Sequence, residues 1–116
     1  MTIFIVEDED ELREFLQTLL SMEHVVHAFA TGRCALKAMR EAAPEVLLSD
    51  LDLVDIPGEE IARQAARIER RPRIVLMSGD RPRLGRAREL ADRVIPKPFS
   101  IAELTEVLTE SFGGMR

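Results

Sequence analysis

The stretch PEVLLSDLDLVDIPG, residues 44–58, decides how the rest of the sequence can fold. Its apolar run Val46–Leu48 is typical of a strand that is buried on both faces of a parallel sheet. The run ends before Asp50, and Pro57 and Gly58 then break the chain. Open α/β sheets bind their ligands at the carboxyl ends of the strands. Asp50 therefore lies where such a fold places its chemistry.

Length and composition predict one globular domain. The chain has 116 residues, 46% of them hydrophobic and 32% charged, which predicts a single domain over residues 1–116. The net charge of -5 argues against nucleic acid as the main ligand. Cys34 is the only cysteine, which excludes an internal disulfide and a cysteine-rich metal site. The first residues lack a basic leader, and no apolar run approaches the roughly 20 residues that cross a bilayer, so we expect a cytoplasmic protein without membrane contacts.

Short apolar segments alternate with segments of helical periodicity. Strands are predicted over residues 3–6, 25–29, 46–48, 73–78 and 94–95. The helices between them are expected to bury Leu12, Phe15, Leu16, Leu19, Leu20, Ala35, Leu36, Met39, Ile61, Ala62, Ala65, Ile68, Ile101, Leu104, Val107 and Leu108. The helix predicted over residues 81–90 is arginine-rich and weakened by Gly85. A capping box of Ser100 and Glu103 predicts the start of the last helix, and Gly113-Gly114 its end.

Five strands that alternate with five helices predict a doubly wound α/β fold with a parallel five-stranded sheet. Right-handed crossovers bring the carboxyl ends of all strands to one edge of that sheet. Four separate segments therefore converge, and the polar residues at or just after their strand ends are Glu7, Asp8, Asp50, Ser78 and Lys97.

The converging residues have the charges and donors of a phosphoryl-transfer site. The carboxylates of Glu7, Asp8 and Asp50 would repel one another without a cation nearby. Lys97 compensates one of the three negative charges, and the remaining two match a divalent cation such as Mg²⁺ or Mn²⁺. In this interpretation Asp50 is the nucleophile that accepts a phosphoryl group, and Ser78 donates a hydrogen bond to that group.

Each of these residues has a simpler interpretation when it is taken alone. The acidic run that begins at Glu7 could be a solvated helix start, and Asp50 could be a turn or cap residue. Ser78 could be an ordinary loop residue and Lys97 a surface lysine. Their common position at the ends of four strands favours the shared site.

Four motifs at the strand ends point to one family. The sequences IVEDE at residues 5–9, LSDL at 48–51, MSG at 77–79 and KPF at 97–99 together resemble the receiver domain of bacterial two-component response regulators. The resemblance covers essentially the whole chain and implies a flavodoxin-like (βα)5 fold with strand order 2-1-3-4-5. It implies that Asp50 receives a phosphoryl group from the phosphohistidine of a histidine kinase or phosphotransfer protein. It also implies that the domain catalyses only its own phosphorylation and dephosphorylation.

The same resemblance assigns a metal site. Mg²⁺ would be held by Asp8, Asp50 and the backbone carbonyl of Asp52. Glu7 would reach the metal through water.

The resemblance also assigns the residues that handle the phosphoryl group. Ser78 would follow that group and Lys97 would pair with it, and the Lys97–Pro98 peptide bond is expected to be cis. Asp52 lies two residues past the phosphoacceptor and Asp80 two residues past Ser78. At these positions the two carboxylates are expected to tune the lifetime of the phosphoryl group.

Two positions depart from the family pattern. Val54 stands where the family usually has proline, so the loop after Asp50 is expected to differ in shape or to have more freedom. Val94 stands where the family usually has tyrosine or phenylalanine, and valine is stiff at χ1. The usual serine-to-aromatic relay is therefore in doubt, and we expect output to depend more on the fourth helix or on the loop after Asp50.

Two other functional classes compete with this hypothesis. Residues 50–54, DLDLV, also fit the signature of haloacid dehalogenase-type phosphatases, but those enzymes place their acidic pair after the lysine, whereas Glu7 and Asp8 come first here. A degenerate receiver that binds partners without being phosphorylated is the other alternative.

The surface expected to transmit the signal is formed by the fourth helix, the fifth strand and the last helix. Arginines make its first part basic and glutamates make its last part acidic, at Arg81, Arg83, Arg86, Arg88, Arg93, Glu103, Glu106 and Glu110. Such charge runs are commonly solvated faces. If this face is functional, it pairs two copies in a homodimer or binds a downstream protein.

Overall fold

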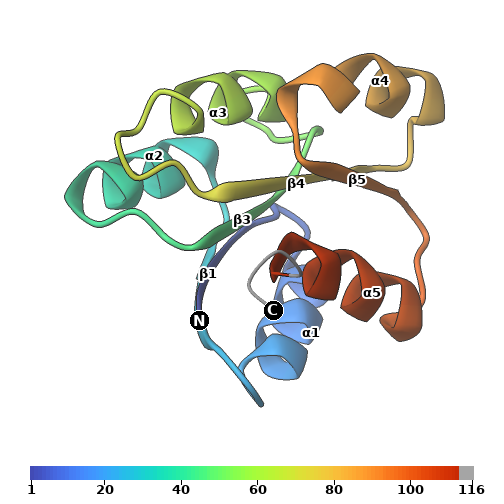
Figure 1. The fold of residues 1–116 in the computed structure, drawn as a ribbon. Helices are drawn as coiled ribbons and strands as arrows, with labels where there is room; N and C mark the ends of the chain where they lie inside the picture. Colours follow the sequence, from blue (N-terminus) through green and yellow to red (C-terminus); the bar gives the residue numbers. More distant parts are fainter. Residues whose placement is uncertain (113–116) are drawn as a thin grey trace.

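The computed structural model describes residues 1–112, whose five strands form one parallel sheet (Figure 1). The strands are β1 (Thr2–Val6), β2 (Val25–Phe29), β3 (Val46–Asp50), β4 (Arg73–Ser78) and β5 (Arg93–Pro96). They lie in the order β2-β1-β3-β4-β5, and every neighbouring pair is parallel. The predicted flavodoxin-like topology is therefore confirmed.

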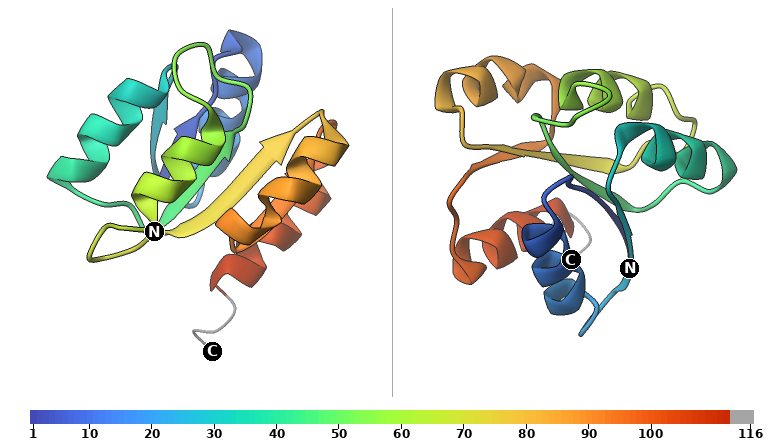
Figure 2. Two further views of the ribbon diagram at one scale, coloured as in Figure 1. Left: turned by 90° about the horizontal axis from the view of Figure 1, so that it is seen from above. Right: turned by 180° about the vertical axis from the view of Figure 1, so that it is seen from behind.

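Helices cover both faces of the sheet, as a doubly wound fold requires. One face carries α1 (Asp10–Leu20) and α5 (Ile101–Phe112), and the other carries α2 (Gly32–Glu41), α3 (Gly58–Ala65) and α4 (Arg81–Arg86). The two groups stand on opposite sides of the sheet in Figure 1 and in the rear view of Figure 2. No helix among the described residues has the length and apolar character needed to cross a bilayer.

Two apolar layers fill the space between the sheet and its helices. The layer under α1 and α5 contains Ile3, Ile5, Leu16, Leu48, Val75, Met77, Leu104 and Leu108. The layer under α2, α3 and α4 contains Phe4, Val6, Leu36, Met39, Leu47, Leu51, Ile61, Leu76 and Leu84. Alternate residues of each central strand enter opposite layers, so β1, β3 and β4 are buried on both faces.

The structure corrects several predictions about which helix residues are buried and where the helices end. Phe15 and Ile101 are 48% and 51% exposed, because they lie at the edges of apolar helix faces that are narrower than their sequence pattern predicted. The segment predicted as one helix over residues 81–90 splits into α4 and a 3₁₀ helix, η1 (Ala87–Leu90). Gly85 lies just before this change, where its low helix propensity weakens the α-helix. The α3 helix ends before Ile68, which is half-buried.

The last helix begins as its sequence predicted. The Ser100 backbone N–H donates to Glu103 Oε1 at 2.9 Å, and the Glu103 N–H donates to Ser100 Oγ at 3.0 Å. This reciprocal pair is the predicted capping box. The predicted helix end at Gly113-Gly114 lies outside the described residues.

The strand register aligns the carboxyl ends of the central strands. Asp50 of β3 lies beside Met77 of β4, and Ser78 of β4 lies beside Pro96 of β5. Residues that end or follow these strands therefore share one edge of the sheet.

Candidate functional site

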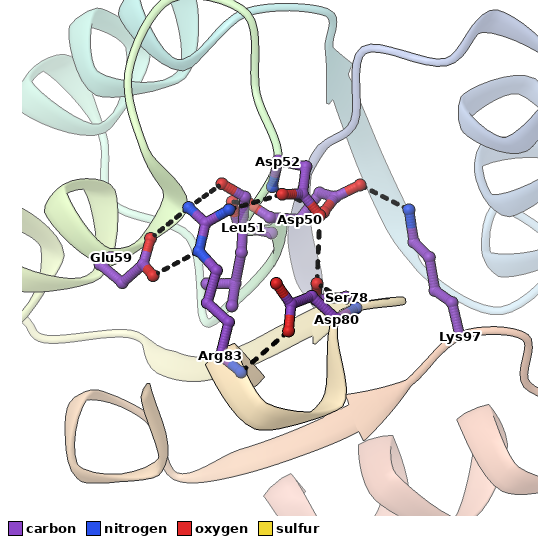
Figure 3. A network of polar contacts seen from close by, with 9 residues as sticks. Asp50, Leu51, Asp52, Glu59, Ser78, Asp80, Arg83 and Lys97 are labelled. Carbon is purple, nitrogen blue, oxygen red and sulfur yellow. Dashed lines mark hydrogen bonds and ion pairs between the residues drawn. The ribbon is translucent and has the colours of Figure 1, made fainter. Parts of the chain in front are cut away.

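Asp50 is the buried last residue of β3. It is 3% exposed. Its Oδ2 atom accepts a hydrogen bond from Lys97 Nζ at 2.5 Å, and its Oδ1 atom accepts one from the Asp52 backbone N–H at 2.9 Å. Figure 3 shows Lys97 reaching Asp50 from the side of β5. Each carboxylate oxygen of Asp50 thus has one donor.

Lys97 joins two acidic residues that lie far from it in the sequence. Its ammonium group also donates to Glu7 Oε1 at 2.8 Å. The backbone N–H of Lys97 donates to the Ser78 carbonyl at 2.9 Å, which fixes the segment just after β5 against the end of β4. The Lys97–Pro98 peptide bond is cis, as expected from the KPF motif.

Glu7 is 1% exposed and follows β1 directly. Its burial raises the pKa of Glu7 to about 7, against the hydrogen bonds from Lys97 and from the Glu9 backbone, which lower it. Burial alone would lower the pKa of Lys97, but its hydrogen bonds to Asp50 and Glu7 outweigh this effect and raise it. The lysine therefore remains charged next to the carboxyl groups of Asp50 and Glu7.

A cation site fits three of the carboxylates. Glu7, Asp8 and Asp50 each offer an oxygen atom, and these atoms lie within 4.8 Å of one another. Oxygen donors at this spacing suit a hard divalent cation. The sequence-predicted group is therefore assembled in space.

Ser78 is fully buried at the end of β4. Its Oγ atom accepts a hydrogen bond from the Asp80 N–H at 3.0 Å and donates one to Asp52 Oδ2 at 3.1 Å. In this structure the serine hydroxyl is therefore bound to the carboxylate of Asp52, not to that of Asp50.

Asp80 also has a structural contact. Its Oδ1 atom accepts the Arg83 backbone N–H at 3.1 Å and caps the first turn of α4. Its carboxylate is exposed beside the end of β4.

The contacts of Arg83 with the loop after β3 were not predicted from the sequence. This side chain runs from α4 across the loop after β3 (Figure 3), where Nε and Nη2 donate to the two oxygens of Glu59 at 2.7 and 2.8 Å. Its Nη1 atom donates to Asp52 Oδ1 at 2.5 Å, and Nη2 also donates to the Leu51 carbonyl at 3.0 Å. The hydrogen bonds to Glu59 raise the pKa of Arg83, and they lower the pKa of Glu59. The available signal was its place three residues after the N-cap Asp80, in the first turn of a helix that begins next to the site.

The α3 helix starts in direct contact with the end of β3. The Gly58 N–H donates to the Leu51 carbonyl at 3.0 Å, and a Cβ atom at Gly58 would lie 2.2 Å from the Asp50 carbonyl oxygen. Only glycine permits this approach. The Leu51 carbonyl consequently has two donors, Gly58 and Arg83.

The loop after Asp50 is hydrogen-bonded to the start of α2, although Val54 stands where receiver domains usually have proline. Val54 itself is 79% exposed. Asp55 accepts hydrogen bonds from the backbone N–H groups of Gly32 and Arg33, both at 2.9 Å, at the start of α2. Asp55 therefore anchors the loop to the start of α2.

Val94 is half-buried and packs against the apolar layer that includes Leu84 of α4. Two arginines of the predicted basic face have partners within the chain: Arg83 lies at the site, and Arg93 forms an ion pair with Glu110. The exposed basic part of this face is therefore limited to Arg81, Arg86 and Arg88.

Comparison with known proteins identifies the family. Residues 3–109 match the family model of the response regulator receiver domain, so the chain belongs to this family of two-component signalling domains. Receiver domains are in general signalling domains and not turnover enzymes. The match to this family therefore argues against the dehalogenase-type phosphatase alternative.

Relatives and solved structures agree with this assignment. The transcriptional regulatory protein CreB of Escherichia coli is 30% identical over 89% of this chain and 47% of its own length. The receiver protein CpdR of Brucella abortus is 29% identical over 88% of both chains. A CheY-like receiver domain from Methylobacillus flagellatus has a TM-score of 0.87 at 30% identity, with 96% of this chain and 98% of that chain covered. The chain spans about a third of the length of AfsQ1 from Streptomyces coelicolor and about half of that of CreB.

Proposed function

We propose that this receiver domain accepts a phosphoryl group on Asp50 and that this change alters its binding to other proteins. The observation that carries the proposal is the buried Asp50 carboxylate, which lies between the ammonium group of Lys97 and a cluster of further acids. Open α/β sheets bind their ligands at the carboxyl ends of the strands, which is where Asp50 lies.

In the proposed reaction an oxygen of Asp50 attacks the phosphorus of a phosphohistidine. The P–N bond of the donor breaks as the P–O bond of an acyl phosphate forms, and the electron pair leaves with the imidazole. Lys97 lies 2.5 Å from Asp50 and would offset charge on the transferred group. Ser78 would exchange its bond to Asp52 for one to the phosphoryl group.

A bound Mg²⁺ would supply further charge neutralisation at the phosphoryl oxygens. Asp8, Asp50 and the backbone carbonyl of Asp52 would hold it, and Glu7 would act through water. A receiver related in fold, TrrA of Thermotoga maritima, has been solved in complex with Mg²⁺ and BeF, at 24% identity and a TM-score of 0.84. Mn²⁺ has the same preference for oxygen ligands and would be a substitute.

The donor in this proposal is a histidine kinase or a phosphotransfer protein. The relatives include two histidine kinases, P4 of Formosa agariphila and TmoS of Ectopseudomonas mendocina, each matched over 88% of this chain. Their similarity to this chain supports a place in a phosphorelay.

The proposed output face consists of α4, β5 and α5. A phosphoryl group adds roughly two negative charges at neutral pH, which is enough to redistribute the hydrogen bonds that hold α4. Without an aromatic residue at Val94, the movement of α4 or of the loop after Asp50 would carry the signal to a downstream protein or a second copy. Sedimentation with and without a phosphodonor tests the second case, and a monomer in both states would reject the homodimer.

Labelling with a small phosphodonor tests the function directly. Wild-type protein incubated with acetyl phosphate and Mg²⁺ should gain the mass of one phosphoryl group, and Asp50→Asn should gain none. A chelator in excess over Mg²⁺ should suppress the gain. An unlabelled wild type would favour the degenerate receiver, whereas turnover of simple phosphate esters would favour the phosphatase class.

A further inference from the structure

Arg83 is the one cation of α4 that the structure ties to the site, and the proposed roles do not use it. Its guanidinium group contacts three residues on two segments: Glu59 on α3, and the Leu51 carbonyl and Asp52 carboxylate on the loop after β3. The Arg83 side chain is 27% exposed and that of Glu59 is 20% exposed. A bidentate, partly buried pair of this kind fixes the direction of the guanidinium group.

The contact with Asp52 brings this arrangement to the phosphoacceptor. Arg83 Nη1 binds Asp52 Oδ1, while the Ser78 hydroxyl binds Asp52 Oδ2. Both oxygens of the carboxylate are thus occupied and its orientation is set. The backbone N–H of Asp52 donates to Asp50 Oδ1. A phosphoryl group on Asp50 that takes the Ser78 hydroxyl would therefore lie close to the Asp52 carboxylate.

We propose that Arg83 is a positioning residue for phosphoryl acceptance at Asp50: it holds the Asp52 carboxylate in place and neutralises it. This inference rests on the proposed function. Without the guanidinium group, Asp52 would present an uncompensated negative charge to the incoming phosphoryl group and would be free to turn toward it. The negative charges of Asp52 and of the phosphoryl group would repel each other at close range, even where solvent screens them.

The structure also explains why this arginine needs Glu59. The carboxylate holds Nε and Nη2 at 2.7 and 2.8 Å, so Nη1 is left to reach Asp52. Lysine at position 83 would keep the charge but not the two-pronged contact. The Arg83→Lys variant therefore separates the effect of charge from that of geometry.

The test measures the rate at which wild type and variants gain a phosphoryl group from acetyl phosphate at saturating Mg²⁺, by intact mass. Arg83→Gln should slow this rate by about threefold to tenfold, the effect of one like charge in a partly screened position. Arg83→Lys should recover part of the rate. Arg86→Gln is the matched control, since it removes the same charge from an exposed position of the same helix, and it should behave as wild type.

A double variant distinguishes positioning from a merely structural role. In an Asp52→Asn background there is no charge for Arg83 to neutralise, so Arg83→Gln should change the rate by less than about twofold. An equal loss in both backgrounds, or an Arg83→Gln rate equal to that of wild type, would overturn the role of Arg83 and leave the proposed function standing. A wild type that acquires no label would overturn both. Unfolding midpoints confirm that each variant is folded at the assay temperature.

Discussion

Asp50 lies between two cations that are held in different ways. On the β5 side, Lys97 is bonded to Asp50 and Glu7, two carboxylates that are nearly inaccessible to solvent. On the α4 side, Arg83 is bonded to Asp52 and Glu59, and the Asp52 side chain is 53% exposed. The first cation contacts Asp50, the proposed phosphoacceptor, and the second contacts Asp52, two residues further along the chain.

This difference in burial implies a difference in strength. Charges paired in a poorly solvated environment interact strongly, and removal of one partner leaves the other uncompensated. Charges paired near solvent are screened and contribute much less. We therefore expect the Lys97 side to decide whether phosphorylation occurs, and the Arg83 side to adjust its rate.

The largest expected effect is on the Lys97 side. Lys97→Gln keeps a polar side chain, one atom shorter than that of lysine, but removes the charge that faces Asp50. Its rate of phosphorylation by acetyl phosphate should fall by roughly 100-fold, the scale found when one oxyanion donor is lost. A loss no larger than that of Arg83→Gln would mean that the two cations are equivalent, and the comparison would fail.

The next effect concerns the cation site that adjoins Lys97. Asp8→Asn replaces one of three clustered carboxylates and should weaken Mg²⁺ binding by at least about tenfold. Since the chain has no tryptophan or tyrosine, calorimetric titration is the appropriate measurement. Glu59→Gln is the control on the Arg83 side. Equal weakening in both variants would show that the cation does not lie at the predicted cluster.

The loop that carries Asp52 should depend on its anchor at α2. Asp55→Ala removes the acceptor of the Gly32 and Arg33 N–H groups and should lower the free energy of unfolding by about 1–2 kcal/mol. Urea unfolding followed by circular dichroism measures the change. Stability equal to that of wild type would mean that solvent replaces the anchor without loss.

The smallest expected effect is that of the Glu59–Arg83 pair on stability. Arg83 lowers the pKa of Glu59 below its ordinary value of 4.5, so the pair's contribution is fully present above pH 4.5 and is lost as the pH falls through the lower, folded-state value. Glu59→Gln should cost about 0.5 kcal/mol at pH 7, and its difference from wild type should shrink in acid. A difference that stays constant down to pH 3 would show that the ion pair is not its source.

The same contrast shows what the sequence could predict. The order of the strands, the convergence of Glu7, Asp8, Asp50 and Lys97, and the cis bond all follow from short motifs at fixed places in the fold. The contacts of Arg83 do not, since they depend on which way one side chain of a short helix turns, and four other arginines lie nearby in the sequence. The partner of Ser78 was also not predictable, because a hydroxyl group with several acceptors in reach takes the one that the surrounding charges fix.

The helix faces show a similar limit. Periodicity placed Leu16 and Leu104 in the core correctly, but it also included Phe15 and Ile101, which lie about half in solvent. An apolar residue at the edge of a helix face is buried only if a neighbour extends far enough to cover it, and that depends on the packing of the whole domain. The loop anchor at Asp55 likewise depends on how closely this loop approaches the start of α2, which is a matter of tertiary packing.

The most direct test of the central claim is to map the phosphoryl group. Protein labelled with acetyl phosphate and Mg²⁺ is treated with borohydride, which reduces an acyl phosphate and leaves free carboxylates unchanged, and its peptides are sequenced by mass spectrometry. We expect reduction at Asp50 alone and none in Asp50→Asn. Reduction at Asp8 or Asp52 in place of Asp50, or at no carboxylate, would contradict the account.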